Sequence, residues 1–335
     1  MSSILPLSAA RFTLTIEKIH TLVAEDMCRV NALIRERLRS DVVLVNELGN
    51  YIIAGGGKRL RPMLVLLSAH AFGYTGAYHI DLAAVVEFIH TATLLHDDVV
   101  DGSELRRGRK TANNLWGNEA SVLVGDFLYS RSFQMMVQVG NPRVMEILAN
   151  ATNIIAEGEV MQLIHCNDPE TSEAHYFEVI RCKTAKLFEA AAELGAILAG
   201  GGHVDEQAAA SYGMHLGTAF QLIDDVLDYS ASAAEMGKNV GDDLEEGKPT
   251  LPLIHSLLHG TPEQVAVVRE AILTGGRENL NQVIEAIEAS GAIAYTVARA
   301  RKEAEKALSA LRNLPSSNYR DALEGLVEFS VNRQY

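Results

Sequence analysis

The sequence is poor in several residue types, and each scarcity excludes a class of protein. Its three cysteines, Cys28, Cys166 and Cys182, are too few and too widely spaced for a disulfide framework or a zinc site. With eight prolines and no Ser/Gly/Pro-rich stretch, the chain shows no linker, so one large domain is expected. No uninterrupted run of about 18 apolar residues occurs, so no membrane span is predicted.

Positive charge is also scarce. The chain has 29 Lys and Arg against 43 Asp and Glu, a formal net charge of -14, which argues against a nucleic-acid partner. Any anionic ligand must then be held by a local basic cluster or by metal. The weak apolar stretch near the N-terminus precedes Arg11 and Lys18 and leads to no cleavage-like region, so no signal peptide is predicted. Reduced thiols and a cytoplasmic location are expected.

What the chain has in abundance is helical periodicity. Segments rich in Ala, Leu, Glu and Ile are separated by short Gly, Pro, Asn or Asp breaks, and no convincing strand pattern appears, which predicts an all-α fold. The predicted helices lie near residues 15–39, 41–54, 62–72, 80–101, 118–139, 143–165, 173–199, 205–230, 250–259, 263–274, 292–312 and 318–332. Residues 82–100 and 211–227 are apolar almost all round, so these two helices should be central in a bundle.

Both of these apolar helices carry the same acidic pattern, two adjacent aspartates and a third three positions on. The two triplets are Asp97, Asp98, Asp101 and Asp224, Asp225, Asp228. On a helix each triplet points to one side, and carboxylates so placed in apolar surroundings raise one another's pKa unless a cation lies among them. An oxygen-only ligand set suits Mg²⁺. A single triplet would equally fit a solvated helix face, but two in buried helices predict a metal-assisted site for a highly charged ligand such as diphosphate.

Two basic segments support an anionic ligand. Residues 55–62, GGGKRLRP, place three cations where a helix is about to begin, a position that favours bound anions. Residues 106–110, RRGRK, directly follow the first triplet. The alternatives are a flexible charged loop for the first segment and a nucleic-acid patch for the second, although the second lacks interleaved aromatics.

Further polar residues fit the same site, although each alone would more often be an ordinary surface or core residue. His90 and Thr93 share the helix face of Asp97 and Asp101, and Gln221 is expected to share that of Asp224. The others are Lys183 and Thr184, in a helix between the triplets, and Lys238 and Lys248, which bracket a Gly/Asp-rich loop.

Taken together, these segments resemble the trans-type isoprenyl diphosphate synthases. The motifs GGGKRLRP, HDDVVDGSELRRGRKT, the Lys183-Thr184 pair, FQLIDDVLDY and GKNVGDDLEEGKPT appear in the family's order. The match runs from about Leu14 to the C-terminus as one synthase domain, residues 14–335, and leaves residues 1–13 as an unmatched extension. It is strongest toward the bacterial enzymes that make octaprenyl diphosphate for the ubiquinone side chain.

The resemblance implies an all-helical isoprenoid-synthase bundle with a central active-site cavity, a homodimer, and three Mg²⁺ ions per site. It assigns Asp97, Asp101 and Asp224 as main metal ligands, with Asp98, Asp225 and Asp228 in support, and gives Lys183 and Arg106 catalytic roles. The positions expected to bind the allylic diphosphate are Arg106, Lys183, Thr184, Gln221, Lys238 and Lys248. Those expected to bind isopentenyl diphosphate are Lys58, Arg61, His90 and Arg107.

Product length depends on the room beside the first triplet. Ala92 and Thr93, one turn before Asp97, are small where short-chain members of the family carry aromatic residues. A product tail would then pass Ile89 and Val86 toward a floor built by Phe133, Met135 or Met136, unless Ala92 and Thr93 are simply close-packing helix residues. An octaprenyl product grown on farnesyl diphosphate is expected, with transient contact to the inner membrane for its release.

Other functions remain open at this point. Heptaprenyl and nonaprenyl products are the alternatives in length. A class I terpene cyclase shares the fold but replaces the second Asp triplet with a different metal motif. A non-catalytic subunit of a heteromeric synthase lacks one or both triplets, and a helical scaffold needs neither.

Overall fold

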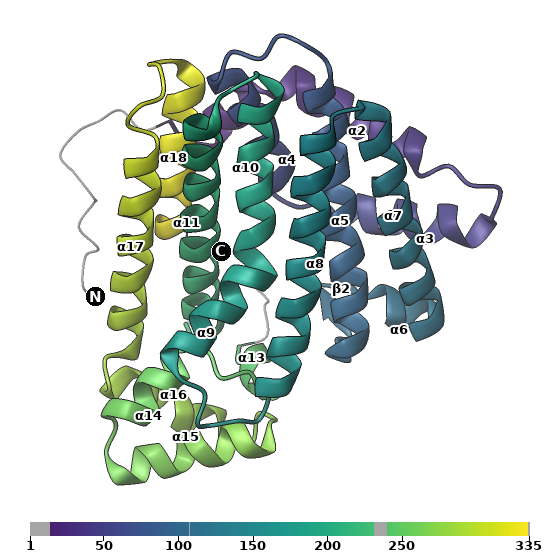
Figure 1. Ribbon diagram of the computed structural model, residues 1–335. Helices are drawn as coiled ribbons and strands as arrows, with labels where there is room; N and C mark the ends of the chain where they lie inside the picture. Colours follow the sequence, from purple (N-terminus) through teal and green to yellow (C-terminus); the bar gives the residue numbers. More distant parts are fainter. Residues whose placement is uncertain (1–13, 107, 231–239, 334–335) are drawn as a thin grey trace.

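The computed structural model describes residues 14–106, 108–230 and 240–333, and these form an α-helical bundle (Figure 1). The first half contains α1 (Ile16–Leu22), α2 (Ala24–Arg37), α3 (Val43–Ala54), α4 (Leu60–Ala71), α5 (Tyr78–Val100), α6 (Ala112–Trp116), α7 (Asn118–Val139) and α8 (Pro142–His165). The second half contains α9 (Glu173–Ile180), α10 (Lys186–Leu198), α11 (His203–Asp228), α13 (Asp242–Glu245), α14 (Leu251–His259), α15 (Pro262–Thr274), α16 (Leu280–Ala289), α17 (Ala292–Ala310) and α18 (Asn318–Asn332).

The sequence-based helices largely agree with the structure, and the differences have local causes. The helix expected over 15–39 is broken at Val23, whose backbone leaves the helical region. The helix over 280–289 was missed, although Val283, Ala286 and Ile287 are buried at helical spacing. The expectation of no strands is corrected by one short hairpin, in which β1 (Leu105–Arg106) pairs antiparallel with β2 (Arg109–Lys110).

Several helices begin at capping residues and prolines that are recognisable in the sequence. Asn141 caps α8 by accepting the N–H of Arg143, and Pro142 occupies the first helical position. At α15, Thr261 and Gln264 form a reciprocal capping box. These caps supply partners for backbone N–H groups that the first turn leaves unbonded, so the helices begin where the sequence predicts.

The two apolar helices occupy the centre of the bundle, as predicted. Most of α5 is buried, and it packs against α4 and α7; α11 packs against α10 and α17. Figure 1 shows α17, α11, α10 and α8 running alongside one another, with α14, α15 and α16 gathered at one end. That end is also where α5 and α11 finish, so both aspartate triplets lie at the same end of the molecule.

The helices at that end have a small core of their own. It includes Leu244, Leu253, Val268, Ile272 and Ile287, and is separate from the large core formed by the long helices. Helix α14 links the two because it contacts both α11 and α17. The second triplet is therefore held between the main bundle and this smaller layer. The prediction of a single domain over residues 14–335 stays a prediction.

A buried ion pair also fastens α17 to α11. The carboxylate of Glu303 lies 2.6 Å from Nδ1 of His215 and 2.8 Å from Nζ of Lys306. Burial raises the pKa of Glu303, but the hydrogen bonds from His215 and Lys306 outweigh it and lower that pKa to about 2. The charged form of Glu303 is thus the one that the packing of α17 stabilises.

A polar cleft between α8, α10 and α11 contains Glu193, a carboxylate in the opposite situation. Glu193 is nearly buried, and burial raises its pKa to about 7, although Arg143 at 3.5 Å opposes the shift. Glu189 and Glu206 also line the cleft and add repulsion. The folded protein binds this proton more tightly than the unfolded chain does, so the stability contributed by protonated Glu193 is lost as the pH rises from about 4.5 to about 7.

Replacing Glu193 by glutamine is expected to raise the free energy of unfolding by about 1 kcal/mol at pH 8 and by much less at pH 5. The gain arises because the amide carries no charge to bury. Urea denaturation at the two pH values measures it. The control is Glu146→Gln, which replaces an exposed carboxylate of α8 and should have the same small effect at both pH values. Equal effects of Glu193→Gln at both pH values would contradict the interpretation.

Candidate active site

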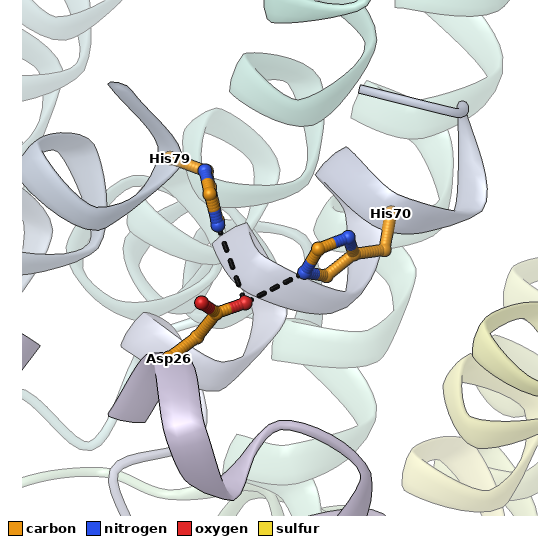
Figure 2. A group of neighbouring side chains, drawn as sticks. All are labelled: Asp26, His70 and His79. Carbon is orange, nitrogen blue, oxygen red and sulfur yellow. Dashed lines mark hydrogen bonds and ion pairs between the residues drawn. The ribbon is translucent and has the colours of Figure 1, made fainter. Parts of the chain in front are cut away.

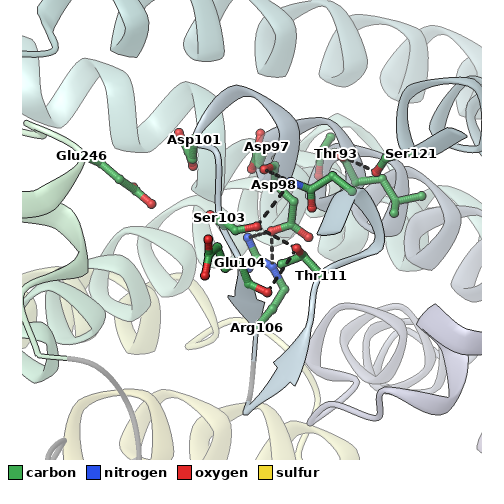
Figure 3. Close-up of polar contacts among 12 residues, drawn as sticks. Thr93, Asp97, Asp98, Asp101, Ser103, Glu104, Arg106, Thr111, Ser121 and Glu246 are labelled. Carbon is green, nitrogen blue, oxygen red and sulfur yellow. Dashed lines mark hydrogen bonds and ion pairs between the residues drawn. The ribbon is translucent and has the colours of Figure 1, made fainter. Parts of the chain in front are cut away.

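The first aspartate triplet lies at the C-terminal end of α5 (Figure 3). Two of its carboxylates face lysines from other elements. Oδ2 of Asp97 is 3.7 Å from Nζ of Lys183, and Oδ2 of Asp101 is 2.9 Å from Nζ of Lys248. Both carboxylates are about 15% exposed, so they remain reachable from solvent. Asp97 and Asp101 are therefore placed to accept a divalent cation.

The third member, Asp98, points away from these lysines. Its side chain is 2% exposed, and its Oδ1 accepts hydrogen bonds of 2.8 Å from two guanidinium nitrogens of Arg106 in β1. Burial raises the pKa of Asp98 and the charge of Arg106 partly offsets this. The pair fixes the hairpin against the end of α5, as Figure 3 shows, so Asp98 holds Arg106 in place.

In the second triplet, too, each carboxylate has a different environment. Oδ1 of Asp224 is 2.8 Å from the guanidinium of Arg333, whose side chain is buried over the ring of Phe220. Asp225 is fully buried and accepts hydrogen bonds from the Tyr176 hydroxyl and from the amide of Gln221. Burial raises the pKa of Asp225 well above its ordinary value. Of these two, Asp224 is the more accessible.

Asp228 closes the second triplet and organises the loop that follows it. Its carboxylate accepts the backbone N–H groups of Asp242 and Asp243 at the start of α13, each at 3.2 Å. Burial and the nearby carboxylate of Asp243 together raise the pKa of Asp228 to about 8, although the backbone hydrogen bonds oppose the shift. The backbone contacts bring residues 242–248 over the end of α11, so that Lys248 reaches the first triplet.

Two lysines occupy the space between the triplets, and both have partners that the sequence did not indicate. Lys183 is 2.6 Å from the carboxylate of Glu159, and Lys248 is 2.5 Å from that of Glu246. With its amide oxygen turned toward them, Gln162 accepts hydrogen bonds of 3.3 Å from both lysines. Burial lowers the pKa of Lys248, but neighbouring carboxylates outweigh this and raise it, so the ammonium stays charged.

The backbone around Lys183 is also unusual. Residues Arg181–Ala185 form a π-helical turn between α9 and α10, a distortion found often at functional sites. A Cβ on Gly158 of α8 would lie 2.7 Å from the backbone nitrogen of Lys183, and one on Gly217 of α11 would lie 2.7 Å from Cα of Ala185. The two glycines let α8 and α11 approach the turn closely, and this places Lys183 between the triplets.

A chain of hydrogen bonds links the predicted residues of this region. The hydroxyl of Thr184 donates to Gln221 at 3.0 Å, and Gln221 donates to Asp225 at 2.8 Å. The sequence placed Gln221 on the face of Asp224, whereas its amide contacts Asp225, one position further on. Thr184, Gln221, Lys183 and Lys248 line one cavity, together with Gln162 and Tyr176.

Tyr176→Phe tests how far this network stabilises the fold. Removing the hydroxyl leaves the buried carboxyl of Asp225 with Gln221 as its remaining side-chain donor, so the free energy of unfolding should fall by about 1–3 kcal/mol. Chemical denaturation gives the value. Tyr129→Phe is a matched control because the Tyr129 hydroxyl makes only a 3.4 Å contact to the carbonyl of Thr152. Equal losses in both variants would show that the Asp225 contact adds nothing.

The basic loop before α4 lies near the same region of the bundle. Arg61 contacts Nε2 of His90 at 3.1 Å and stacks on the ring of Phe188, and Lys58 lies over the ring of Phe329 in α18. The loop's third cation, Arg59, instead pairs with the buried carboxylate of Glu87 on α5. Arg59 therefore anchors the loop. The predicted ligands Arg107 and Lys238 lie outside the described residues.

The residues expected to set product length lie one turn before Asp97. Ala92 is fully buried, and His96, one turn further along, contacts the backbone of Val122 in α7. Thr93 is partly exposed and donates its hydroxyl to the carbonyl of His90. The two helices α5 and α7 pack closely, and the predicted floor residues Phe133, Met135 and Met136 lie further along α7.

The site as a whole defines a class of protein. It combines two aspartate triplets, cations interleaved between them and a basic loop at one end of an apolar helical bundle. Its carboxylate oxygens suit a hard divalent cation, which can replace or supplement the lysines as their counter-charge. This chemistry fits an enzyme that acts on anionic substrates with the help of a divalent cation.

Comparison with known proteins agrees with that class. A model of the polyprenyl synthetase family matches residues 42–289, and the chain belongs to this family. It is 56% identical to octaprenyl diphosphate synthase of Escherichia coli (strain K12) over 321 residues, 96% of this chain and 99% of that protein. The corresponding enzyme of Haemophilus influenzae is 53% identical over 323 residues, 96% of this chain and 98% of that protein.

A solved structure shows the same fold. The polyprenyl synthase from Caulobacter crescentus CB15, complexed with calcium and isoprenyl diphosphate, superposes with a TM-score of 0.93. It is 44% identical, and the match covers 97% of this chain and 100% of that one. The predicted isoprenoid-synthase bundle is thus confirmed.

Proposed function

We propose that this protein is a long-chain trans-polyprenyl diphosphate synthase. It would add isopentenyl diphosphate units to an allylic primer such as farnesyl diphosphate and yield octaprenyl diphosphate for a quinone side chain. The observation that carries the proposal is that Asp97 and Asp101 of the first triplet contact Lys183 and Lys248, and that Asp225 of the second triplet lines the same cavity as these two lysines. The identity of more than half with octaprenyl diphosphate synthases over nearly the full chain supports the product class.

The accessible carboxylates are the proposed metal ligands. Asp97, Asp101 and Asp224 would bind Mg²⁺, three ions per site, with Asp98, Asp225 and Asp228 in support. The contacts above suggest what that support is: Asp98 orients Arg106 and Asp225 orients Gln221. Bound Mg²⁺ would neutralise the diphosphate and stabilise it as a leaving group.

The cations divide between two substrates. Arg106, Lys183, Thr184, Gln221 and Lys248, with Lys238, would bind the allylic diphosphate. Lys58, Arg61 and His90, with Arg107, would bind isopentenyl diphosphate. The contact between Arg61 and His90 supports this grouping, as does the distance of 3.7 Å between Lys183 and Asp97.

The reaction follows from this charge distribution. Lys183, Lys248 and Arg106 meet the negative charge that develops on the departing diphosphate, and they are already oriented by ion pairs with Glu159, Glu246 and Asp98. Loss of diphosphate leaves an allylic cation, which the double bond of isopentenyl diphosphate attacks. The proton lost in forming the new double bond passes to the departing diphosphate. The apolar walls of the bundle exclude water, which would otherwise quench the cation.

A homodimer in the cytoplasm is part of the proposal. Exposed apolar side chains gather on two neighbouring helices: Val122, Leu123 and Val137 on α7, and Val160, Leu163 and Ile164 on α8. Such a surface favours association with a second copy. None of the helices among the described residues combines the length and apolar character needed to span a bilayer. Contact with the inner membrane would then be transient and peripheral.

Incubation with farnesyl diphosphate, isopentenyl diphosphate and Mg²⁺, followed by mass spectrometry, tests the proposal. The expected product is octaprenyl diphosphate, formed only when Mg²⁺ is present. A series of shorter or longer prenyl diphosphates would correct the proposed product length but would still identify the protein as a polyprenyl diphosphate synthase. A cyclised hydrocarbon, or no turnover with any allylic primer, would overturn it.

A further inference from the structure

A second cluster of ligating side chains lies at the other end of α5. Asp26 on α2, His70 in the last turn of α4 and His79 in the first turn of α5 converge on one point (Figure 2). His79 is 18 residues before Asp97 on the same helix, which places it about 27 Å from the first triplet. The function proposed above makes no use of these three residues.

The three side chains converge through the atoms that bind metals. Nε2 of His70 is 2.7 Å, and Nε2 of His79 3.2 Å, from the same Oδ2 of Asp26. One ligand atom from each residue lies within 4.8 Å of the others, and among the described residues only this group of three has such geometry. Each residue comes from a different helix, so the cluster joins α2, α4 and α5.

The surroundings fix the orientation of each ligand. Oδ1 of Asp26, the oxygen turned away from the histidines, is 3.1 Å from the guanidinium of Arg29. The ring of His70 stacks on Tyr319 of α18, and that of His79 packs edge-on against Tyr74. Outer partners of this kind orient ligating side chains in metal sites. Nδ1 of His79 is buried without a hydrogen-bond partner in the described structure, so the ring is held through Nε2 alone.

The protonation states suit a metal at neutral pH. Burial lowers the pKa of His79, which outweighs the attraction of Asp26, so this imidazole is neutral. Burial raises the pKa of Asp26, but the hydrogen bond from His70 and the contacts with His79 outweigh it, so the carboxylate is ionised. Neutral imidazole and carboxylate are the forms that bind cations. Because Nε2 of each ring donates to Asp26, binding at Nε2 requires the proton of neutral His79 to shift to Nδ1, without net loss of a proton from His79 or Asp26.

We propose that Asp26, His70 and His79 form a binding site for a transition-metal dication such as Zn²⁺, separate from the Mg²⁺ site. Two imidazoles and one carboxylate match the ligands of zinc, whereas Mg²⁺ prefers oxygen alone. Bonds of about 2.0–2.1 Å in a tetrahedral site separate ligand atoms by roughly 3.3 Å, so the pairs now at 2.7 and 3.2 Å need to open only slightly. Asp26 and His70 are partly exposed, and that side admits the ion and a water as fourth ligand.

The bound ion would act as a structural cross-link. It would tie α2 to the start of α5 and to the end of α4, and through the stacked ring of Tyr319 it would also steady α18. Since the ion binds the folded chain and not the separated helices, zinc should raise the thermal unfolding midpoint.

The test uses full-length protein stripped with chelator, freed of any affinity tag and kept in excess Mg²⁺ to occupy the aspartates. Titration with Zn²⁺, followed by calorimetry, should give one site per chain. Zinc should also raise the midpoint by at least about 2 °C. Co²⁺ in place of Zn²⁺ should produce the visible absorption of a four-coordinate site. His70→Gln should abolish all three responses, and because His70 is partly exposed it should fold.

A competing pair of histidines provides the matched control. His255 and His259 are stacked on α14 with ring centroids 4.1 Å apart, and His259 is exposed. His259→Gln should leave binding at the proposed site unchanged. If His70→Gln binds as much zinc as the parent, or if His259→Gln removes the binding, the proposal is wrong and the three residues form only a hydrogen-bonded cluster. Diffraction at the zinc edge, with an anomalous peak between Asp26 and His79, gives an independent readout.

Discussion

Asp97→Ala is expected to reduce the rate of prenyl transfer by about 10³-fold or more, whatever the concentration of Mg²⁺. Asp97 is partly exposed and faces Lys183, so its removal takes away a proposed metal ligand and leaves that lysine with Glu159 as its carboxylate partner. Release of diphosphate from farnesyl and isopentenyl diphosphates measures the rate. A Mg²⁺ titration of the variant separates lost affinity from lost chemistry.

The matched control for this variant is Asp126→Ala on α7. Asp126 is 62% exposed, and its carboxylate lies 3.4 Å from His96, the residue directly before Asp97. Asp126 is therefore close to the first triplet but is not one of the residues that line the cavity. Its replacement should leave the rate within about twofold, because exposed ion pairs contribute little. Similar rates for Asp97→Ala and the parent would show that Asp97 is not a metal ligand needed for catalysis. They would favour the alternative that the protein is a helical scaffold.

Ala92→Phe is expected to shorten the product to about the C15 to C20 class, because an aromatic ring would block the path beside α5 that the growing chain is proposed to take. Ala92 is fully buried, His96 one turn further along α5 contacts the backbone of Val122 in α7, and the predicted floor residue Phe133 lies further along α7. Mass analysis of the products after complete consumption of farnesyl diphosphate measures the length. The number of isopentenyl diphosphate units added to each primer should fall, while the rate of the first addition should stay close to that of the parent.

The same ring also overpacks a closed contact, so a second variant is needed. Thr93→Phe changes the neighbouring, partly exposed position on the face of Asp97 and should shorten the product with less effect on the melting temperature. Val137→Phe, on the exposed side of α7, is the control and should leave the length unchanged. Full-length octaprenyl diphosphate from both Ala92→Phe and Thr93→Phe would show that neither residue limits the chain.

The sequence was sufficient for those features that local spacing determines. The aspartate triplets, their buried helices and the position of Lys183 follow from helical periodicity and short motifs. What each aspartate contacts did not follow. Asp98 and Asp225 belong to the same pattern as Asp97 and Asp224, yet they are turned toward Arg106 and Tyr176. Spacing fixes the face of a helix and does not show what packs on it.

The partners that the sequence missed come from remote elements. Glu159 and Gln162 on α8 read as ordinary helix residues, and Arg333 lies near the end of the chain. The Asp26 cluster is assembled from three helices and has no motif. For Glu159, the glycine at 158 was an available signal, because a helical glycine often marks a close approach of backbones.

The last turns of α8, residues 159–164, have an inner and an outer side with different environments. Glu159 and Gln162 face inward to Lys183, whereas Val160, Leu163 and Ile164 face outward and are exposed. In the proposed homodimer, a partner covering the outer side would restrict the motion of the turn that orients the lysine. Dilution that separates the two chains would then lower the affinity for the allylic substrate before any helix unfolds. The turnover per chain would therefore depend on the protein concentration.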